Sequence, residues 1–353
     1  MTEKAEEKQY RCPGESYTIS DSVCRGRQRV NYPKCNVCLE KVEPGGFAQS
    51  HAEPKLSINI FKSYDIRGKY PSELNDTTAH KIGTSIALFF REKNPDVKNI
   101  VVGRDMRLSS KSLANALIEG LCTAGLNVIN VGVVSSEMTY FAVGHYKYDG
   151  GVMVTASHNP AEYNGFKLCR EQAIPVSFET GIDRISKLTK QYHPLRGEHL
   201  GKVMVSDIFA DYKKHVLKFA SNLRHLRVVI DAGNGMAGKT IPLVCEGLPI
   251  EIIPLYFELD GSFPNHEANP LKPENMVDLQ KKVRETRAHL GVAFDGDADR
   301  CVFVDEMGRI IGCDIITALI AKQILEREKG ATILYDLRSS WIVPEEIKAA
   351  GGI

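Results

Sequence analysis

Residues 99–131, NIVVGRDMRLSSKSLANALIEGLCTAGLNVINV, contain the pattern that predicts the fold of this chain. Residues 99–103 are a short apolar run typical of a buried strand. Residues 109–124 place leucines and alanines at helical spacing behind a pair of serines that can cap a helix. Residues 126–131 form a returning strand, so the order strand, helix, strand predicts an α/β unit with a parallel sheet.

The same unit recurs further along the chain. A second strand, helix and strand are expected at residues 226–231, 237–246 and 250–255. A third copy begins with an expected strand at 332–336 and an expected helix at 339–350. Three copies of one unit predict a repeated α/β architecture. Because the third strand lacks a neighbour, we expect that copy to be loosely ordered and the chain to be a fragment.

The composition of the 353 residues is typical of a globular protein with two or more domains. Hydrophobic residues make up 43% and charged residues 25%, which excludes bulk disorder and coiled coil. Lys and Arg number 45 against 44 Asp and Glu, so the charge indicates neither nucleic acid nor a membrane as partner. The sequence shows neither an apolar run of membrane-spanning length nor a secretory signal, and we expect a cytoplasmic protein.

The first 55 residues form a polar, cysteine-rich extension that differs from the rest of the chain. A possible Zn²⁺ site is formed there by Cys12, Cys24, Cys35 and Cys38. In a reducing compartment such a cluster favours metal over disulfide, with incidental thiols and a redox CxxC pair as alternatives. The other cysteines lie in apolar or strand-like stretches, and we expect buried thiols at Cys122, Cys169, Cys245, Cys301 and Cys313.

Residues 154–160, VTASHNP, end an expected strand and carry the first candidate site. Small neighbours leave room for a phosphate beside Ser157, and His158 can move protons. Asn159 and Pro160 are turn formers that would hold the loop. Open α/β sheets bind ligands at this edge, so the pattern indicates a reactive hydroxyl, with an ordinary strand-to-turn corner as the alternative.

Residues 294–300, FDGDADR, lie between two expected strands and carry the second candidate site. The carboxylates of Asp295, Asp297 and Asp299 alternate with small residues and can converge on a hard cation such as Mg²⁺. A calcium EF-hand is excluded, because Arg300 stands where that loop requires glycine and because the flanks are predicted as strands. A solvated acidic turn is the alternative.

Residues 231–240, DAGNGMAGKT, match both the GxxxxGK[ST] and the GxGxxG patterns between a strand and a helix. One segment that satisfies two incompatible patterns shows how permissive both are, and Pro242 removes an N–H at the start of the helix. Nucleotide binding through Gly233–Thr240 is therefore an alternative function. The simpler interpretation is that glycines let the strand turn sharply into the helix.

Basic residues lie in several glycine-flanked loops. Arg67 belongs to the segment at 64–68, Arg104 and Arg107 to the segment at 103–110, and Lys167 follows the serine loop. Arginine binds phosphate through two N–H groups, and lysine acts as a point charge or proton donor. Each alone is typical of a surface ion pair, but with the serine and the aspartates they form a set suited to phosphoryl transfer.

Taken together, these motifs resemble the α-D-phosphohexomutase superfamily, and most closely its bacterial phosphomannomutase/phosphoglucomutase branch. The resemblance covers about residues 56–353. It rests on segments that occur in the order of that superfamily: YDIRG at 64–68, the loop at 103–110, TASHNP at 155–160, NGFK at 164–167, DAGNGMAG at 231–238, NPLKPEN at 269–275 and DGDADR at 295–300.

The resemblance implies a role for each matching residue. Ser157 would be the phosphoserine, and its phosphate would share Mg²⁺ with Asp295, Asp297 and Asp299. Proton transfer and charge stabilisation would fall to Arg67, His158, Lys167 and Arg300. Substrate and phosphate would be bound by Arg104, Arg107 and Asn159. The implied enzyme is an isomerase that moves phosphate between C1 and C6 of mannose or glucose through a 1,6-bisphosphate, which is also its activator.

The resemblance also implies the domain organisation: three-layer α/β/α domains with mixed sheets behind the extension at 1–55. Domain I at 56–204 would hold the serine loop and domain II at 205–307 the metal loop. Domain III at 308–353 would be incomplete and domain IV absent, so we expect weak or no turnover. A non-catalytic zinc-containing interaction module is a further alternative, and the sequence names no partner for the extension.

Overall fold

The computed structural model describes residues 9–10, 19–20, 58–194, 200–220 and 223–353. The chain divides into two units, residues 1–55 and residues 56–353. In the first unit, strands β1 (Gln9–Tyr10) and β2 (Ile19–Ser20) pair antiparallel. The cysteines of the expected zinc site lie outside the described residues: Cys12, Cys24, Cys35 and Cys38.

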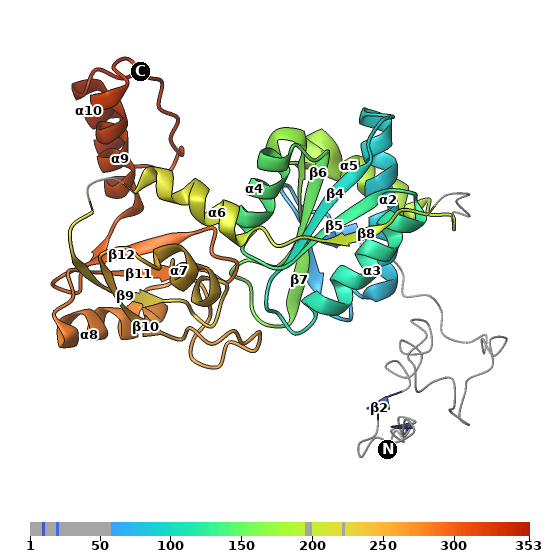
Figure 1. The fold of residues 1–353 in the computed structure, drawn as a ribbon, viewed down its shortest axis with the longest axis horizontal. Coiled ribbons are helices and arrows are strands. Elements are labelled where there is room, and N and C mark those ends of the chain that lie inside the picture. The colour runs from blue at the N-terminus through green and yellow to red at the C-terminus, as the bar shows by residue number, and fades with distance from the viewer. Residues whose placement is uncertain (1–8, 11–18, 21–57, 195–199, 221–222) are drawn as a thin grey trace. The chain divides into compact units, whose positions relative to one another are not determined.

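The second unit begins with a six-stranded mixed sheet in the order β3-β7-β6-β4-β5-β8 (Figure 1). Strands β6, β4, β5 and β8 run parallel, whereas β7 runs antiparallel to both of its neighbours, β6 and β3. The bounds of the strands are β3 (Ile66–Lys69), β4 (Asn99–Arg104), β5 (Asn127–Val133), β6 (Gly150–Val154), β7 (Tyr163–Arg170) and β8 (Val203–Val205).

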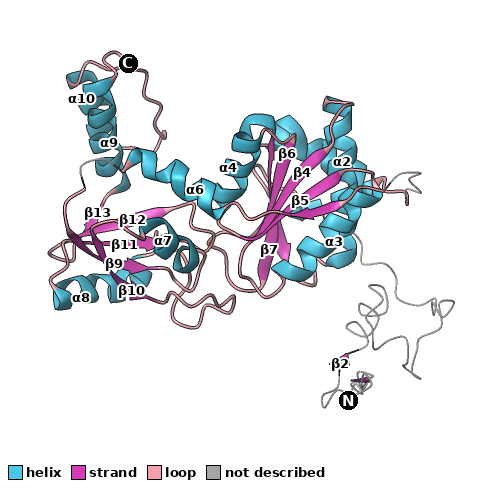
Figure 2. Cartoon of the chain, viewed as in Figure 1, coloured by secondary structure: helices cyan, strands magenta, loops and turns pink. Residues whose placement is uncertain are grey.

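Helices cover both faces of this sheet. This follows because successive residues of β4 enter different hydrophobic cores. Ile100 and Val102 pack with residues of α2, α3 and α5, whereas Val101 packs with residues of α4 and α6. Figure 2 shows α2, α3 and α4 beside the strands of this sheet. The predicted three-layer α/β/α arrangement is therefore confirmed here. The bounds of the helices are α2 (Asp76–Lys93), α3 (Ser110–Thr123), α4 (Ser136–Tyr146), α5 (Asp183–Lys190) and α6 (Phe209–Val216).

A second mixed sheet has five strands in the order β10-β9-β11-β12-β13. Strand β9 runs parallel to β10 and β11, and β12 runs antiparallel to β11 and β13. Val229 packs with α8 on one face, and Val228 packs with Ile241 of α7 on the other. The bounds are β9 (Leu226–Asp231), α7 (Ala237–Cys245), β10 (Ile250–Leu255), α8 (Val277–Thr286), β11 (Leu290–Phe294), β12 (Cys301–Asp305) and β13 (Ile310–Ile311).

The third expected unit differs from its prediction. Helices α9 (Cys313–Arg327) and α10 (Ile342–Ala349) pack through a small apolar core. The strand expected at 332–336 does not form. Instead Ile333 donates its N–H to the carbonyl of Ile353 at 2.8 Å, and Ile353 donates to Ala331 at 3.1 Å. That is one step of a parallel ladder, and a strand needs a longer neighbour to be stabilised.

Solvent exposure also corrects one expectation about the cysteines. Cys169 is buried as expected, but Cys301 and Cys313 are exposed, because they lie where β12 begins and where α9 begins. Within the residues that the structure describes, no helix is both long enough and apolar enough to cross a membrane.

Candidate active site

Ser157 lies in the loop between β6 and the antiparallel β7, at the C-terminal edge of the parallel strands. Its backbone φ is 54°, in the left-handed region that residues other than glycine rarely adopt. Its N–H donates to Thr155 Oγ1 at 2.9 Å, and the residue is buried. Such backbone strain tends to be kept where it places a functional side chain.

A buried arginine holds the serine loop in this conformation. Arg107 is 1% exposed, and Asp105 lies 3.3 Å from its Nε. Its terminal nitrogens donate to the carbonyl oxygens of Ser157 at 2.9 Å, Asn159 at 2.6 Å, Pro160 at 2.8 Å and Tyr163 at 3.1 Å. These contacts support the backbone of the serine loop, and phosphate binding by Arg107 stays a prediction.

The aspartates of the metal loop converge as their spacing predicts. Asp295, Asp297 and Asp299 follow β11, and each offers a carboxylate oxygen within 4.8 Å of the other two. Asp295 and Asp297 are fully buried, and Asp297 Oδ1 has no hydrogen-bond partner among the described residues. A buried anionic oxygen without a partner is costly. Oxygen donors in this arrangement fit a hard divalent cation such as Mg²⁺.

The glycine loop after β9 supports the metal loop. Met236 donates its N–H to the carbonyl of Gly296 at 2.9 Å, and a Cβ on Gly235 would lie 2.7 Å from that same oxygen. A Cβ on Gly296 would in turn lie 2.5 Å from the carbonyl oxygen of Ser157. The glycines therefore permit close backbone approach between three loops.

The nucleotide-binding alternative is not supported, because the glycine loop directs its donors inward. The N–H of Gly233 donates to Asp231 Oδ1 at 2.8 Å, and the N–H of Asn234 donates to the carbonyl of Tyr256 at 2.9 Å. Lys239, which would have to reach a nucleotide phosphate, donates to the carbonyl of Val133 at 2.8 Å. A phosphate-binding loop instead points its backbone N–H groups at the ligand.

Polar contacts join the serine loop of the first sheet to the metal loop of the second. Ser157 Oγ donates to Asp295 Oδ2 at 2.8 Å, and Arg300 contacts that hydroxyl while its Nε donates to the same carboxylate at 3.0 Å. Lys167 Nζ donates to Asp297 Oδ2 at 2.7 Å and contacts Asp299. The Lys167 ammonium group therefore places a positive charge in contact with two of the three aspartates.

The local charges shift the protonation of these groups. Burial, together with the charges of Asp297 and Asp299, raises the pKa of Asp295 to about 7. Burial opposes the charge on Lys167, but the same two aspartates raise its pKa above the usual value. Burial and the charge of Arg300 lower the pKa of His158 to about 4. The imidazole is therefore neutral near pH 7.

The remaining predicted residues gather at the same sheet edge. Arg67 NH1 donates to Asn159 Oδ1 at 2.7 Å, and Arg104 is half-buried and donates to the carbonyl of Asp105 at 3.2 Å. Sequence reasoning missed Ser136, which donates its hydroxyl to Asp297 Oδ2 at 2.5 Å. It is the first residue of α4, so in the sequence it resembles an ordinary helix-capping serine.

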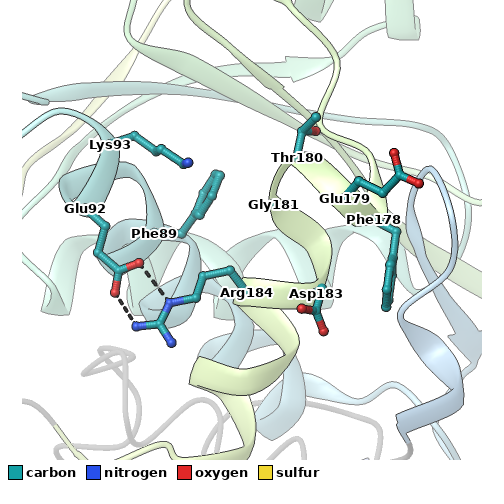
Figure 3. Close-up of a pocket in the computed structure, with 9 residues that line it drawn as sticks. All are labelled: Phe89, Glu92, Lys93, Phe178, Glu179, Thr180, Gly181, Asp183 and Arg184. Atoms are coloured by element: carbon teal, nitrogen blue, oxygen red, sulfur yellow. Dashed lines mark hydrogen bonds and ion pairs between the residues drawn. The ribbon is translucent and has the colours of Figure 1, made fainter.

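A separate pocket of about 370 Å³ lies between the C-terminal end of α2 and the turn before α5 (Figure 3). Arg184 bonds Glu92 with two nitrogens, at 2.9 and 2.6 Å. Of the predicted site residues that the structure describes, none lines this pocket. The candidate chemistry therefore does not lie there.

A half-buried histidine, His266, contacts the buried Asp231 at the end of β9. His266 Nε2 is 3.0 Å from Asp231 Oδ2, and Nδ1 is 2.8 Å from the carbonyl oxygen of Glu267. The same loop packs Phe263 against Arg107, with 4.9 Å from Cζ to the ring centre. Burial opposes a charge on His266, but its hydrogen bond to Asp231 raises the pKa above the usual value.

We expect His266→Gln to lower the free energy of unfolding more at pH 6 than at pH 9. A raised pKa in the folded state adds stability below the ordinary histidine pKa of about 6.5, and that stability is lost as the pH rises through the raised value. Urea denaturation at both pH values measures the difference. His193→Gln, at an exposed position, is the matched control, and an equal loss at both pH values would disprove the charged pair.

The site combines a serine hydroxyl on a strained backbone with a neutral imidazole, two cationic side chains and a carboxylate triad. Such a set is suited to metal-assisted phosphoryl transfer. Comparison with protein families agrees with this class. Residues 59–195 match the model for phosphoglucomutase/phosphomannomutase, alpha/beta/alpha domain I, and residues 209–308 match the model for domain II. The chain belongs to the phosphoglucomutase/phosphomannomutase family, which confirms the resemblance seen in the sequence.

Individual relatives point the same way. The chain is 40% identical over 303 residues to a phosphomannomutase of Vibrio cholerae, and 41% identical over 300 residues to a protein of Xanthomonas campestris named phosphohexose mutases. These matches cover 84% of this chain but 65% and 66% of the relatives, so the chain spans just under two thirds of their length.

A solved structure supports the same assignment of the fold. It is a crystal structure of a phosphoglucomutase/phosphomannomutase family protein from Burkholderia thailandensis, with a TM-score of 0.78 at 34% identity. The match covers 84% of this chain and 65% of that protein.

Proposed function

We propose that this chain carries the phosphoryl-transfer half of a phosphohexomutase that interconverts the 1-phosphate and 6-phosphate of mannose or glucose. Ser157 gives and takes the phosphoryl group through a hexose 1,6-bisphosphate, which also acts as activator. The observation that carries the proposal is the 2.8 Å hydrogen bond from Ser157 Oγ to Asp295 Oδ2. It joins a strained serine of the first sheet to the aspartates of the second.

The metal in this proposal is Mg²⁺, held by Asp295, Asp297, Asp299 and an oxygen of the phosphorylated Ser157. When bound, the ion neutralises charge on the phosphoryl group. Asp297 Oδ1, which has no hydrogen-bond partner in the described part of the chain, supports this ligand set. Lys167 keeps its proton on Nζ, because the neighbouring aspartates raise its pKa, and so adds a fixed positive charge.

We propose that His158 takes the proton of Ser157 during attack on the substrate phosphate. Its Nδ1 lies 3.4 Å from Ser157 Oγ, and its lowered pKa keeps the ring neutral. The serine oxygen then bonds to phosphorus, the bond from phosphorus to the sugar oxygen breaks, and that oxygen takes up the proton that His158 received. Arg300 contacts both Ser157 and His158, so it can stabilise charge at either group.

The phosphate of the sugar is assigned to residues that remain at the edge of the sheet. Arg67 and Asn159 are hydrogen-bonded to each other, and Arg104 ends the neighbouring strand β4. Both arginines can present N–H groups to phosphate oxygens.

We also propose the domain bounds 56–204, 205–307 and 308–353 and a cytoplasmic location.

The proposal is tested by the half-reaction. The full chain is mixed with Mg²⁺ and one equivalent of glucose or mannose 1,6-bisphosphate, and phosphorus NMR follows the products. We expect a seryl phosphate and a hexose monophosphate to appear together, and neither to appear in the presence of a chelator. Bisphosphate that remains intact with Mg²⁺ present would contradict the proposed function.

For the N-terminal extension we propose one structural Zn²⁺ per chain, with Cys12, Cys24, Cys35 and Cys38 as ligands. Four thiolates leave no open coordination position, so the role is structural. Elemental analysis of protein purified without chelator is expected to find about one zinc per chain. Zinc that is retained after Cys35→Ser and Cys38→Ser together would exclude this site.

A further inference from the structure

Two exposed cysteines, Cys301 and Cys313, lie next to one end of the β12–β13 ladder. The antiparallel register pairs Val304 with Ile310 and Phe303 with Ile311. Continued by two residues, this register places Cys301 opposite Cys313. The intervening Gly312 has φ −58° and ψ 138°, so the chain stays extended beyond β13 until Cys313 begins α9.

The expected spacing suits a covalent link. Directly opposed residues of antiparallel strands have Cα atoms about 4.5–5.5 Å apart and side chains on the same face. A disulfide requires about 4.4–6.8 Å between Cα atoms. The alternation along β12 agrees, because Val302 and Val304 enter the core under α8 and Cys301 must then face the other side.

Both thiols are exposed to solvent. Cys301 and Cys313 are exposed, whereas Cys169 is buried within the first sheet. The pair also adjoins the candidate active site, since Cys301 directly follows Arg300, which contacts Ser157 Oγ.

We propose that Cys301 and Cys313 form a redox modification site, which closes to an intramolecular disulfide by exchange with a small disulfide such as oxidised glutathione. One cysteine thiolate attacks the small disulfide, forms a mixed disulfide and releases one thiol. The second cysteine attacks the protein sulfur of that mixed disulfide and releases the other thiol. The two cysteines together lose two electrons and two protons, and the small disulfide is reduced to two thiols.

The sequence allows a clear readout. Trypsin cleaves after Arg300, Arg309 and Lys322, so the two cysteines fall into separate peptides, residues 301–309 and residues 310–322. The full chain is reduced, exposed to oxidised glutathione, alkylated, digested and analysed by mass spectrometry. We expect the linked pair of peptides to exceed the glutathione adducts of these two peptides more than about tenfold, because the second exchange step is intramolecular.

Single variants separate a true pair from two independent thiols. In Cys301→Ser the glutathione adduct on Cys313 should persist, in Cys313→Ser the adduct on Cys301 should persist, and dithiothreitol should reverse every form. Cys245→Ser is the matched control and should leave the link unchanged. The proposal is overturned if the wild-type chain carries separate adducts or alkyl groups at Cys301 and Cys313, or links either one to a different cysteine.

Discussion

Phosphorylation of the chain by hexose 1,6-bisphosphate is expected to fall by at least about 10³-fold in Ser157→Ala, which is the scale of loss when a nucleophile is removed. The substitution removes the Oγ that contacts Asp295 and Arg300 and leaves the other members of the site in place. Arg107 holds the loop through backbone carbonyls, so the loop keeps its support when the side chain is shortened. Intact mass after reaction with the bisphosphate measures the loss.

A control substitution at another serine and the position of the phosphate show whether Ser157 is the nucleophile. Ser112→Ala removes an exposed hydroxyl of α3 that bonds to Asp76, and it should leave phosphorylation at the wild-type level. Peptide mapping of the wild-type chain should find the phosphate in the peptide that contains Ser157. A label on another residue, or full labelling of Ser157→Ala, would assign the nucleophile elsewhere.

Local patterns in the sequence were sufficient for most of the fold. The strand at 226–231 has the predicted bounds, and the helix expected at 109–124 forms as α3 (Ser110–Thr123). Apolar period and turn residues decide such elements within a dozen neighbours. The strand expected at 332–336 depends on pairing with a distant segment, and that pairing consists of one ladder step. Local propensity alone could not show this.

The candidate site was predictable where its residues form contiguous motifs. The serine loop and the metal loop were each recognisable, although Ser157 and Asp295 are 138 positions apart in the chain. Burial could not be read from the sequence, so the contacts of the Arg107 guanidinium with carbonyl oxygens of the serine loop were not predicted. Ser136 was missed because its contact with Asp297 spans 161 positions and leaves no local signal.

The glycine loop shows why a motif needs its structural context. Its pattern satisfies two nucleotide-binding signatures, yet the N–H of Met236 donates to Gly296 of the metal loop. Both nucleotide binding and packing against the metal loop require glycines that allow close backbone approach. The sequence pattern does not show whether a nucleotide or the metal loop is approached.

Asp297→Asn is expected to weaken metal binding by at least about 100-fold, since loss of even an outer-shell partner costs about 10–100-fold. The variant keeps the shape of the side chain but removes a negative charge that faces Lys167 at 2.7 Å and Ser136 at 2.5 Å. The carboxylate is fully buried, so water cannot replace the missing ligand oxygen easily. Mn²⁺ binding followed by electron paramagnetic resonance measures this change without reference to activity.

Two further variants test whether the loss of Mn²⁺ binding depends on the position of the aspartate. Asp299 is the exposed member of the triad, so Asp299→Asn should weaken Mn²⁺ binding less than Asp297→Asn does. Asp278→Asn alters an exposed carboxylate that accepts a hydrogen bond from Tyr256, and it should bind Mn²⁺ like the wild-type chain. Metal-dependent phosphorylation of Ser157 should follow the same order, because the carboxylate that accepts its hydroxyl belongs to the same triad. Identical Mn²⁺ curves for the wild-type chain and Asp297→Asn would show that the converging carboxylates do not bind the metal.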